Sequence, residues 1–312
     1  MTNKNYRVLF PFIVIIGLIA VSTASILIRF AQQEAPSFVI ASLRMVIATL
    51  MISPIAIGNY ANEIVSINRK DLFLIIMAGF FLALHFATWV TSLEYTSIAS
   101  SVVLVSTGPL WVAIISALWL REDYNNFTFL GIFVAIIGVV IITLNDSCFY
   151  NELIICSDNL TRFDSKLVLG DILALIGAVS VAGYFLIGRV LRPKINLIPY
   201  IFLVYGSASI FLILLLIISK ESILGFSNTT YLWIFLLALF PQLIGHSIYN
   251  WSLKHISATL ASMVTLGEPI GTTILAILIF KEFPGLLKVI GMLMILAGIF
   301  YVSRLNRVSS NA

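Results

Sequence analysis

Glu268 and Pro269 stand side by side about midway along an apolar stretch, where an ionisable group is least expected. Such a group in hydrocarbon is costly and usually faces a protein interior. The proline ring interrupts the helical hydrogen-bond ladder and can leave carbonyl groups free near a cavity. Glu268 could therefore bind a cationic group or, with its charge destabilised by burial, exchange a proton. The alternative is a structural role as the partner of an arginine or a helix end.

Other polar and aromatic side chains recur at helical spacing. His85 and Trp89 are four residues apart, so they would share one helix face. A second face would carry Gln242, His246, Tyr249 and Asn250. Each histidine could line a path for a solute or hydrogen-bond a neighbouring helix. Trp111 and Tyr184 could join Trp89 in the wall of an aromatic cavity for an apolar or cationic solute, or they could pack against helices or lipid.

Arg44 lies a few residues inside another apolar stretch. It could pair with a carboxylate such as Glu268, bind an anionic group, or extend to the membrane interface. Two glycine pairs also have helical spacing: Gly131 and Gly138, and Gly291 and Gly298. Residues seven apart lie on one helix face, so these glycines are expected to permit close helix packing, within the chain or in a homodimer.

The composition indicates the environment in which these residues act. Hydrophobic residues make up 60% of the 312 residues and charged residues only 10%. Soluble domains average roughly 25% charged residues. Because a bilayer solvates apolar surface directly, the composition predicts an integral membrane protein in contact with lipid. The basic residues lie between apolar stretches and not in one patch, which argues against nucleic-acid binding.

Ten apolar stretches account for most of the chain. They lie at roughly 8–28, 38–58, 72–93, 97–120, 128–145, 169–191, 197–219, 230–252, 257–280 and 285–303. Stretches of about 20 residues cross a hydrocarbon core of about 30 Å as helices. Helices are expected because they satisfy their own backbone groups in lipid. We therefore predict an all-α membrane protein with ten transmembrane helices.

A shift of 160 residues aligns the two halves of the chain. Leu and Ile matches between apolar helices arise by chance, so the matches at other residue types carry the weight. These pairs include Gly17 and Gly177, Arg29 and Arg189, Pro109 and Pro269, Glu122 and Glu282, Gly131 and Gly291, and Gly138 and Gly298. Five spans in each half make the second half enter the membrane from the opposite side. The prediction is thus two inverted five-helix repeats, a recurrent plan of secondary transporters.

The repeat also predicts domain boundaries and topology. The first repeat covers 1–146, an extracytoplasmic connecting loop 147–168, the second repeat 169–303 and a cytoplasmic tail 304–312. With both termini in the cytoplasm, eleven of the 18 Lys and Arg residues lie inside and six outside, with Arg44 in a span. The first stretch superficially matches a signal peptide, but it is long enough to span and recurs at 169–191, so we expect it to be retained.

Cysteine chemistry is confined to the predicted connecting loop. Cys148 and Cys156 are the two cysteines of the chain. Two cysteines support neither a zinc site nor a disulfide framework, and a single disulfide between them stays open. The predicted loop lies outside the membrane, where such a bridge could form in an oxidising compartment.

Several motifs resemble the EamA-type transporters of the drug/metabolite transporter superfamily. The first half carries His85-Phe86-Ala87-Thr88-Trp89, the stretch 92–100, Pro109 and Arg121-Glu122. The second half repeats the pattern with 253–258, Gly267-Glu268-Pro269, Lys281-Glu282, Gly291 and Gly298. The resemblance covers the whole chain. It implies a ten-span carrier, most simply an exporter of amino acids, other metabolites or drugs in a bacterial inner membrane, with uptake of a small organic cation or metabolite as the alternative.

The residues also bear on which activities are excluded. No two-histidine-plus-acid spacing, Gly-x-Ser-x-Gly motif or phosphate-binding glycine loop is present, so we expect neither an enzyme nor an ATP-driven pump, and no cofactor or metal. A channel-like protein stays an alternative. The predicted mechanism is alternating access, with a small-molecule substrate held near mid-membrane by Glu268, His85, His246 and nearby aromatic residues, and with proton coupling as a further option.

Overall fold

The computed structural model describes residues 3–119, 130–131, 133–138, 141, 165–256 and 258–309. Every regular element in these ranges is a helix, which confirms the all-α class. The predicted fifth span, the connecting loop with Cys148 and Cys156, and Arg121-Glu122 lie wholly or largely outside the described residues. The ten-span count therefore stays a prediction.

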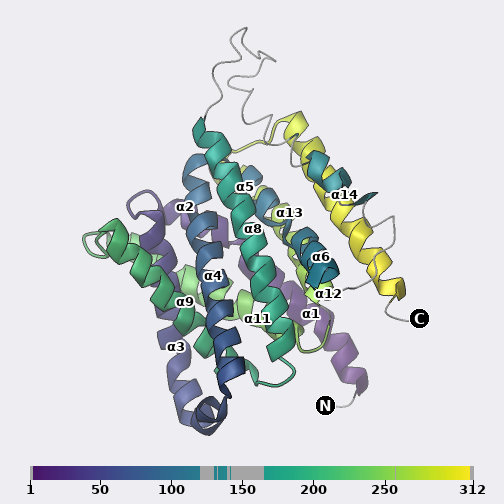
Figure 1. Cartoon of the computed structure of the whole chain (residues 1–312). Coiled ribbons are helices and arrows are strands. Elements are labelled where there is room, and N and C mark those ends of the chain that lie inside the picture. The colour runs from purple at the N-terminus through teal and green to yellow at the C-terminus, as the bar shows by residue number, and fades with distance from the viewer. Residues whose placement is uncertain are drawn as a thin grey trace.

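The helices of the first half form a bundle with those of the second (Figure 1). The first half contains α1 (Asn3–Ser22), α2 (Ala24–Ala31), α3 (Ser37–Ser66), α4 (Arg69–Tyr95), α5 (Ile98–Val105) and α6 (Gly108–Trp119). The second contains α8 (Ser165–Leu191), α9 (Leu197–Ser219), α10 (Asn228–Leu237), the π-helix η1 (Ala238–His246), α11 (Ser247–Ser252), α12 (Ala258–Val264), the 3₁₀-helix η2 (Thr265–Gly267), α13 (Glu268–Phe280) and α14 (Leu286–Ser309).

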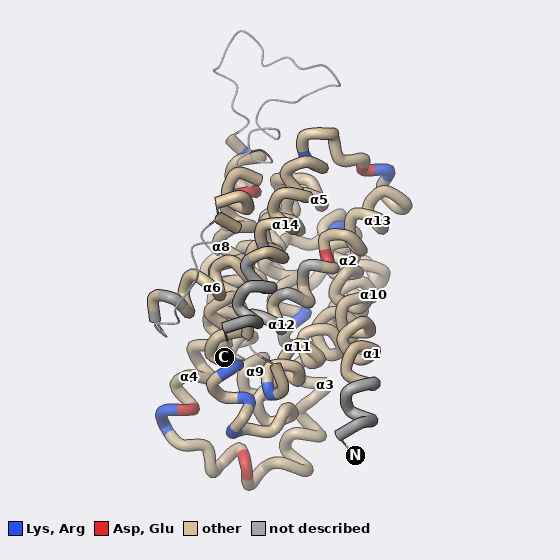
Figure 2. Tube along the Cα trace, turned by 90° about the vertical axis from the view of Figure 1, so that its right-hand side faces the viewer, with Lys and Arg blue, Asp and Glu red and all other residues tan. Residues whose placement is uncertain are grey.

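Seven helical stretches in the described residues are long and apolar enough to cross a membrane. They are Leu9–Ala31, Ser37–Ser66, Arg69–Tyr95, Ile98–Ser116, Ser165–Leu191, Leu197–Ser219 and Asn228–Ser252. Two shorter apolar helices cover Glu268–Phe280 and Leu286–Gly298. Large apolar side chains such as Phe12, Leu214 and Ile218 are exposed on the outside of the bundle. Most charged positions lie toward its two ends (Figure 2). This distribution is that of a multi-pass membrane protein, whose outer surface faces lipid.

Helices far apart in sequence pack side by side. The pairs with the most extensive contact are α4 with α8 and α3 with α9, so each half packs against the other. The core between them contains fully buried Ile28, Met45, Leu82 and Phe86. α14 runs from the upper end of the bundle toward the end at which α1 begins (Figures 1 and 2).

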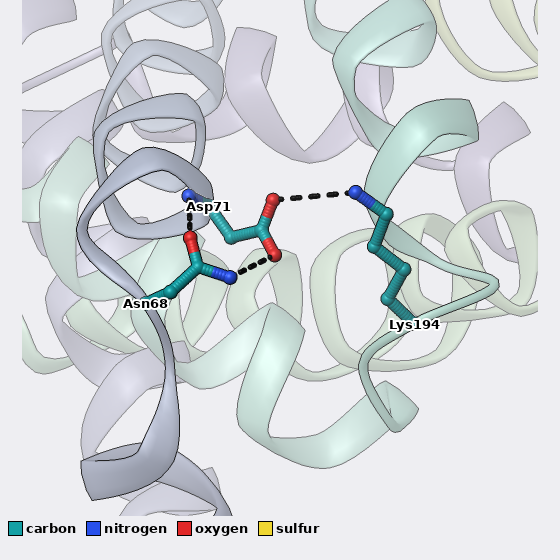
Figure 3. Close-up of polar contacts among 3 residues, drawn as sticks. All are labelled: Asn68, Asp71 and Lys194. Carbon is teal, nitrogen blue, oxygen red and sulfur yellow. Dashed lines mark hydrogen bonds and ion pairs between the residues drawn. The ribbon is translucent and has the colours of Figure 1, made fainter.

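At one end of the bundle, the loop after α8 is tied to the start of α4 (Figure 3). Lys194 Nζ lies 3.4 Å from Asp71 Oδ1. Asn68 begins α4 as its N-cap, because its side chain accepts a hydrogen bond from the Asp71 amide at 2.9 Å and donates to the Asp71 carboxylate at 2.8 Å. The Asp71 carboxylate thus serves both a helix start and an ion pair between the halves.

The loop after α2 makes a corresponding contact with the start of α10. Glu34 accepts hydrogen bonds from the Ser227 amide at 2.8 Å and the Thr230 hydroxyl at 2.9 Å. Ser227 is the N-cap of α10 and accepts from the Thr230 amide. These donors, led by the Ser227 amide, lower the pKa of Glu34, which lies in the loop between two spans, below its ordinary value. A negative charge also suits the positive end of a helix.

Candidate functional site

Several interrupted helices surround one cavity. The break between α1 and α2 falls at Thr23, and Ser106 and Thr107 form the turn between α5 and α6. η1 replaces α-helix around Pro241, and η2 separates α12 from α13. Residues at or next to each interruption line the cavity: Val21, Ala24, Ser106, Gly108, Pro241, His246, Thr265 and Glu268. Irregular backbone is tolerated at membrane depth where it borders a cavity, and π-helical turns often mark functional sites.

The cavity is of a size that suits a small organic molecule. Its empty volume is about 530 Å³, within the range of roughly 300–1,000 Å³ for small-molecule sites. Six of the residues predicted from the sequence line it: Arg44, His85, Trp89, His246, Tyr249 and Glu268. They come from five different elements, α3, α4, η1, α11 and α13. The fold therefore brings together side chains that are up to 224 residues apart, from Arg44 to Glu268.

Arg44 is fully buried in the cavity wall. Its Nε donates to Gln242 Oε1 at 3.0 Å, and its guanidinium carbon lies 4.0 Å from the centroid of the Phe86 ring. Nη1 and Nη2 have no hydrogen-bond partner among the described residues. No ion pair within 4.0 Å joins Arg44 to Glu268 in the described part of the chain. The burial contradicts the expected alternative in which Arg44 extends to the membrane interface.

The two histidines and two aromatic residues form a connected wall. His85 stacks on Trp89 with ring centroids 5.6 Å apart and an interplanar angle of 17°. His246 lies 6.4 Å from His85 and 6.2 Å from Tyr249, centroid to centroid. His85 Nδ1 is 2.9 Å from the Gly177 carbonyl oxygen. A carbonyl can only accept, so Nδ1 carries the proton and a neutral His85 has an acceptor at Nε2.

Glu268 occupies the first position of α13, directly after η2. Its side chain is half-buried and borders the cavity. Pro269 follows in the first turn of α13, where a missing backbone N–H leaves no helical hydrogen bond unmade. Pro269 therefore starts a helix segment at the cavity, and the interruption expected near it lies just before it.

Four predicted site residues lie behind the cavity lining. Gln242 holds Arg44 from behind, and Tyr184 accepts a hydrogen bond from Asn250 Nδ2, which also bonds the His246 carbonyl at 2.8 Å. Trp111 is half-buried and donates to Thr107 Oγ1 at 3.2 Å. We had expected all four side chains to contact the solute. Their hydrogen bonds are instead satisfied by neighbouring elements, which positions them as supports of the site.

Small and apolar lining residues were missed by the sequence reasoning. Val21, Ala24, Val181, Phe185 and Ser106 all border the cavity. None is unusual in an apolar helix, so residue type carried no signal. One usable signal was the repeat, because Val181 lies 160 positions after Val21, as Tyr249 does after Trp89.

Similarity to known proteins agrees with this architecture. The EamA-like transporter family matches residues 10–144 and 168–304. An uncharacterised transporter of Archaeoglobus fulgidus is 27% identical over 278 residues, covering 89% of this chain and 92% of its own length. An uncharacterised transporter of Clostridium kluyveri is 25% identical over 276 residues, covering 86% and 84%. The uncharacterised transporter YetK of Bacillus subtilis is 22% identical over 276 residues, covering 87% and 80%.

A solved crystal structure shares the fold. It superposes with a TM-score of 0.67 at 15% sequence identity and covers 95% of this chain and 97% of the other. The helical bundle with its cavity among interrupted spans is that of a multi-pass membrane transporter. The chain belongs to the EamA-like transporter family of the drug/metabolite transporter superfamily.

Proposed function

We propose that this protein is a secondary transporter that moves a small organic solute across the membrane by alternating access. The observation that carries the proposal is the cavity of about 530 Å³, lined by Arg44, Glu268 and two histidines among interrupted helices of a transporter-family chain. Charged groups within a membrane protein are costly and mark substrate paths by default. We further propose export from a bacterial cytoplasm as the direction, with both termini on the cytoplasmic side.

Two inverted five-helix repeats are part of the proposal. Gln32 Nε2 donates to the Val90 carbonyl at 2.8 Å, and Arg192 Nε donates to the Asn250 carbonyl at 3.0 Å. Each member of the second contact lies 160 residues after its counterpart in the first. A repeated hydrogen bond between different residue types supports a shared backbone geometry in the two halves, because sequence likeness alone would not preserve it.

The glycine pairs add a reciprocal contact between the last spans of the halves. A Cβ added at Gly138 would lie 2.6 Å from the Gly291 carbonyl oxygen, and one added at Gly298 would lie 2.5 Å from the Gly131 carbonyl oxygen. Exchanging the two halves converts one contact into the other. Reciprocal contacts are expected of halves related by a two-fold axis, which supports the predicted repeat and assigns these glycines to packing within one chain.

The test is flux in proteoliposomes that contain the purified full-length chain. Candidate solutes come from the metabolites whose secretion or toxicity changes between a deletion strain and an overexpressing strain. A carrier gives saturable, gradient-dependent flux and accelerates exchange when unlabelled solute is present on the opposite side. Linear, non-saturating flux favours the channel alternative, and accumulation of solute in the overexpressing strain favours uptake over export.

Proton coupling by Glu268 is a separate part of the proposal. It is supported by the position of this carboxyl group at the cavity, close to the start of α13. An imposed pH gradient should drive accumulation of solute in wild-type proteoliposomes. Glu268→Gln should abolish that dependence, whereas unchanged pH-driven accumulation in the variant excludes Glu268 as the proton carrier.

A further inference from the structure

Unpartnered hydrogen-bond donors gather around the cavity. Arg44 Nη1 and Nη2 and Trp89 Nε1 are buried, can only donate, and have no partner among the described residues. The Tyr249 hydroxyl, the Ser106 hydroxyl and His246 Nδ1 are also unpartnered there. Buried polar groups in folded proteins are nearly always satisfied, so such a cluster calls for an acceptor that the chain itself does not supply. An oxyanion is the strongest acceptor for a guanidinium.

The Arg44 side chain is oriented to bind such a group. Gln242 engages Nε, and the Phe86 ring covers the face of the guanidinium. These contacts leave the two terminal nitrogens, the pair that binds a carboxylate through parallel hydrogen bonds. Because Arg44 is fully buried, its charge lacks the water that would otherwise solvate it.

Glu268 places an opposite charge on the same cavity. Both side chains line it, yet the described residues show no ion pair between them within 4.0 Å. The two charges are therefore separated within one enclosed space. A solute with only a cationic group would leave the donors around Arg44 unsatisfied, and a solute with only an anionic group would face the Glu268 carboxylate. A solute with both charges complements both residues.

The remaining lining is apolar or aromatic. Phe185 and Tyr249 meet edge to face with centroids 6.4 Å apart, and Val21 and Val181 also border the space. Trp89 presents its ring next to that of His85. Such walls favour an apolar group on the solute, placed between its two charged ends.

We infer that the transported solute is a small zwitterion, whose carboxylate binds Arg44 and whose ammonium group binds Glu268. The inference rests on the proposed transport function and names the substrate class for the same cavity. Arg44 and Glu268 are then binding residues with separate roles, each reading one end of the solute.

The experiment compares solutes that differ only in charge. Phenylalanine carries both charges, 3-phenylpropanoate lacks the ammonium group and 2-phenylethylamine lacks the carboxylate. Corresponding triplets with aliphatic side chains, starting from leucine and valine, extend the panel. Stabilisation of the purified full chain against heat measures binding, and exchange in proteoliposomes measures transport. In at least one triplet, the zwitterion should bind and exchange with at least ten-fold higher apparent affinity than either single-charge analogue.

Variants then assign the two ends. Arg44→Gln should lower the apparent affinity for the zwitterion at least ten-fold while changing that for the amine less than about two-fold. Glu268→Gln should do the converse, sparing the acid. Arg189→Gln serves as the matched control, because Arg189 is also an intramembrane-helix arginine bonded to a carbonyl, that of Leu253 at 2.9 Å, but does not line the cavity. Arg44→Lys keeps the charge without the paired donors and should bind the zwitterion with intermediate affinity.

The wild-type comparison keeps the test decisive even if a variant does not fold. If an amine, an acid or an uncharged solute is transported with an affinity equal to or above that of every zwitterion tried, the inference is overturned while the transport function stands. If no solute from the panel or the metabolite screen shows saturable exchange, the proposed function itself fails.

Discussion

The two halves of the molecule share their backbone contacts but differ in the charges they bring to the cavity. The contact of Gln32 with the Val90 carbonyl recurs in the second half, and Thr49 Oγ1 lies 3.2 Å from Ser209 Oγ, a residue 160 positions later. At the cavity the correspondence ends. Position 44 is arginine where the second half has Val204, and position 108 is glycine where the second half has Glu268.

This difference separates the requirements of the fold from those of the site. A transporter that alternates between two states needs halves that can adopt equivalent packing, which favours shared contacts between helices. Recognition of a solute needs groups placed once, at defined points. Each half thus supplies one unmatched charge. The predictions below break this comparison at the charges first, then at the packing, and last at the ends of the bundle.

The largest effect is expected from the unmatched carboxylate. Glu268→Gln should reduce transport by roughly 30-fold or more, since truncating one partner of a buried charge pair costs about 2–5 kcal/mol. Flux in proteoliposomes measures the effect, and size-exclusion chromatography establishes that the variant is folded. Glu63→Gln is the control, because Glu63 accepts hydrogen bonds from Asn196 at an exposed end of the bundle. Wild-type flux in Glu268→Gln would remove this residue from the site.

Packing between the halves should respond next. Gly298→Ala places a methyl group 2.5 Å from the Gly131 carbonyl oxygen, and backbone cannot move aside cheaply. Overpacking of this kind costs about 1–3 kcal/mol, so the thermal midpoint of the purified protein should fall. Gly58→Ala is the matched control, since nothing lies within 4 Å of its added methyl group. Equal midpoints in the two variants would contradict the close contact.

A smaller effect is expected where the first half lacks a side chain. In Gly108→Ala the added methyl group would lie 3.2 Å from Val181 Cγ1, next to the cavity. A shift of a few tenths of an ångström accommodates it, so the protein should fold. The smaller cavity should weaken solute binding by roughly ten-fold or less, of the order of the 1–3 kcal/mol expected of a change of one methylene in a pocket. Exchange kinetics should show a raised KM, and an unchanged KM would place the solute away from Gly108.

The smallest effects are expected at the two ends of the bundle. Glu34, at the start of α10, has a lowered pKa, so its contribution to stability is complete above its unfolded-state pKa and is lost as pH falls through its lower folded-state value. Glu34→Gln should reduce the loss of thermal stability on acidification. At the other end, Asp71→Asn removes an exposed ion pair with Lys194 worth about 0–1 kcal/mol. That variant should weaken the salt dependence of the thermal midpoint, and an unchanged salt dependence would show that the pair contributes nothing.

Periodicity and composition predicted much of the fold because a bilayer imposes a simple rule. Seven of the predicted apolar stretches coincide with long helices in the described residues, and the glycine spacing predicted close packing. The helix interruptions were not predicted in detail. Ser106 and Thr107 are not strong helix breakers, and the π-helix around Pro241 depends on how neighbouring helices satisfy its backbone. Such interruptions reflect contacts made by other elements.

The sequence by itself determined that this chain lies in a membrane, that its halves are related and that a few ionisable residues interrupt its apolar spans. Only the tertiary structure decided which of those residues meet. Arg44 and Glu268 share a cavity, whereas Tyr184 and Asn250 bind each other behind it. The physical reason is that hydrophobic patterning specifies depth and helical face, but the rotation and crossing of each helix follow from packing against helices far away in the sequence.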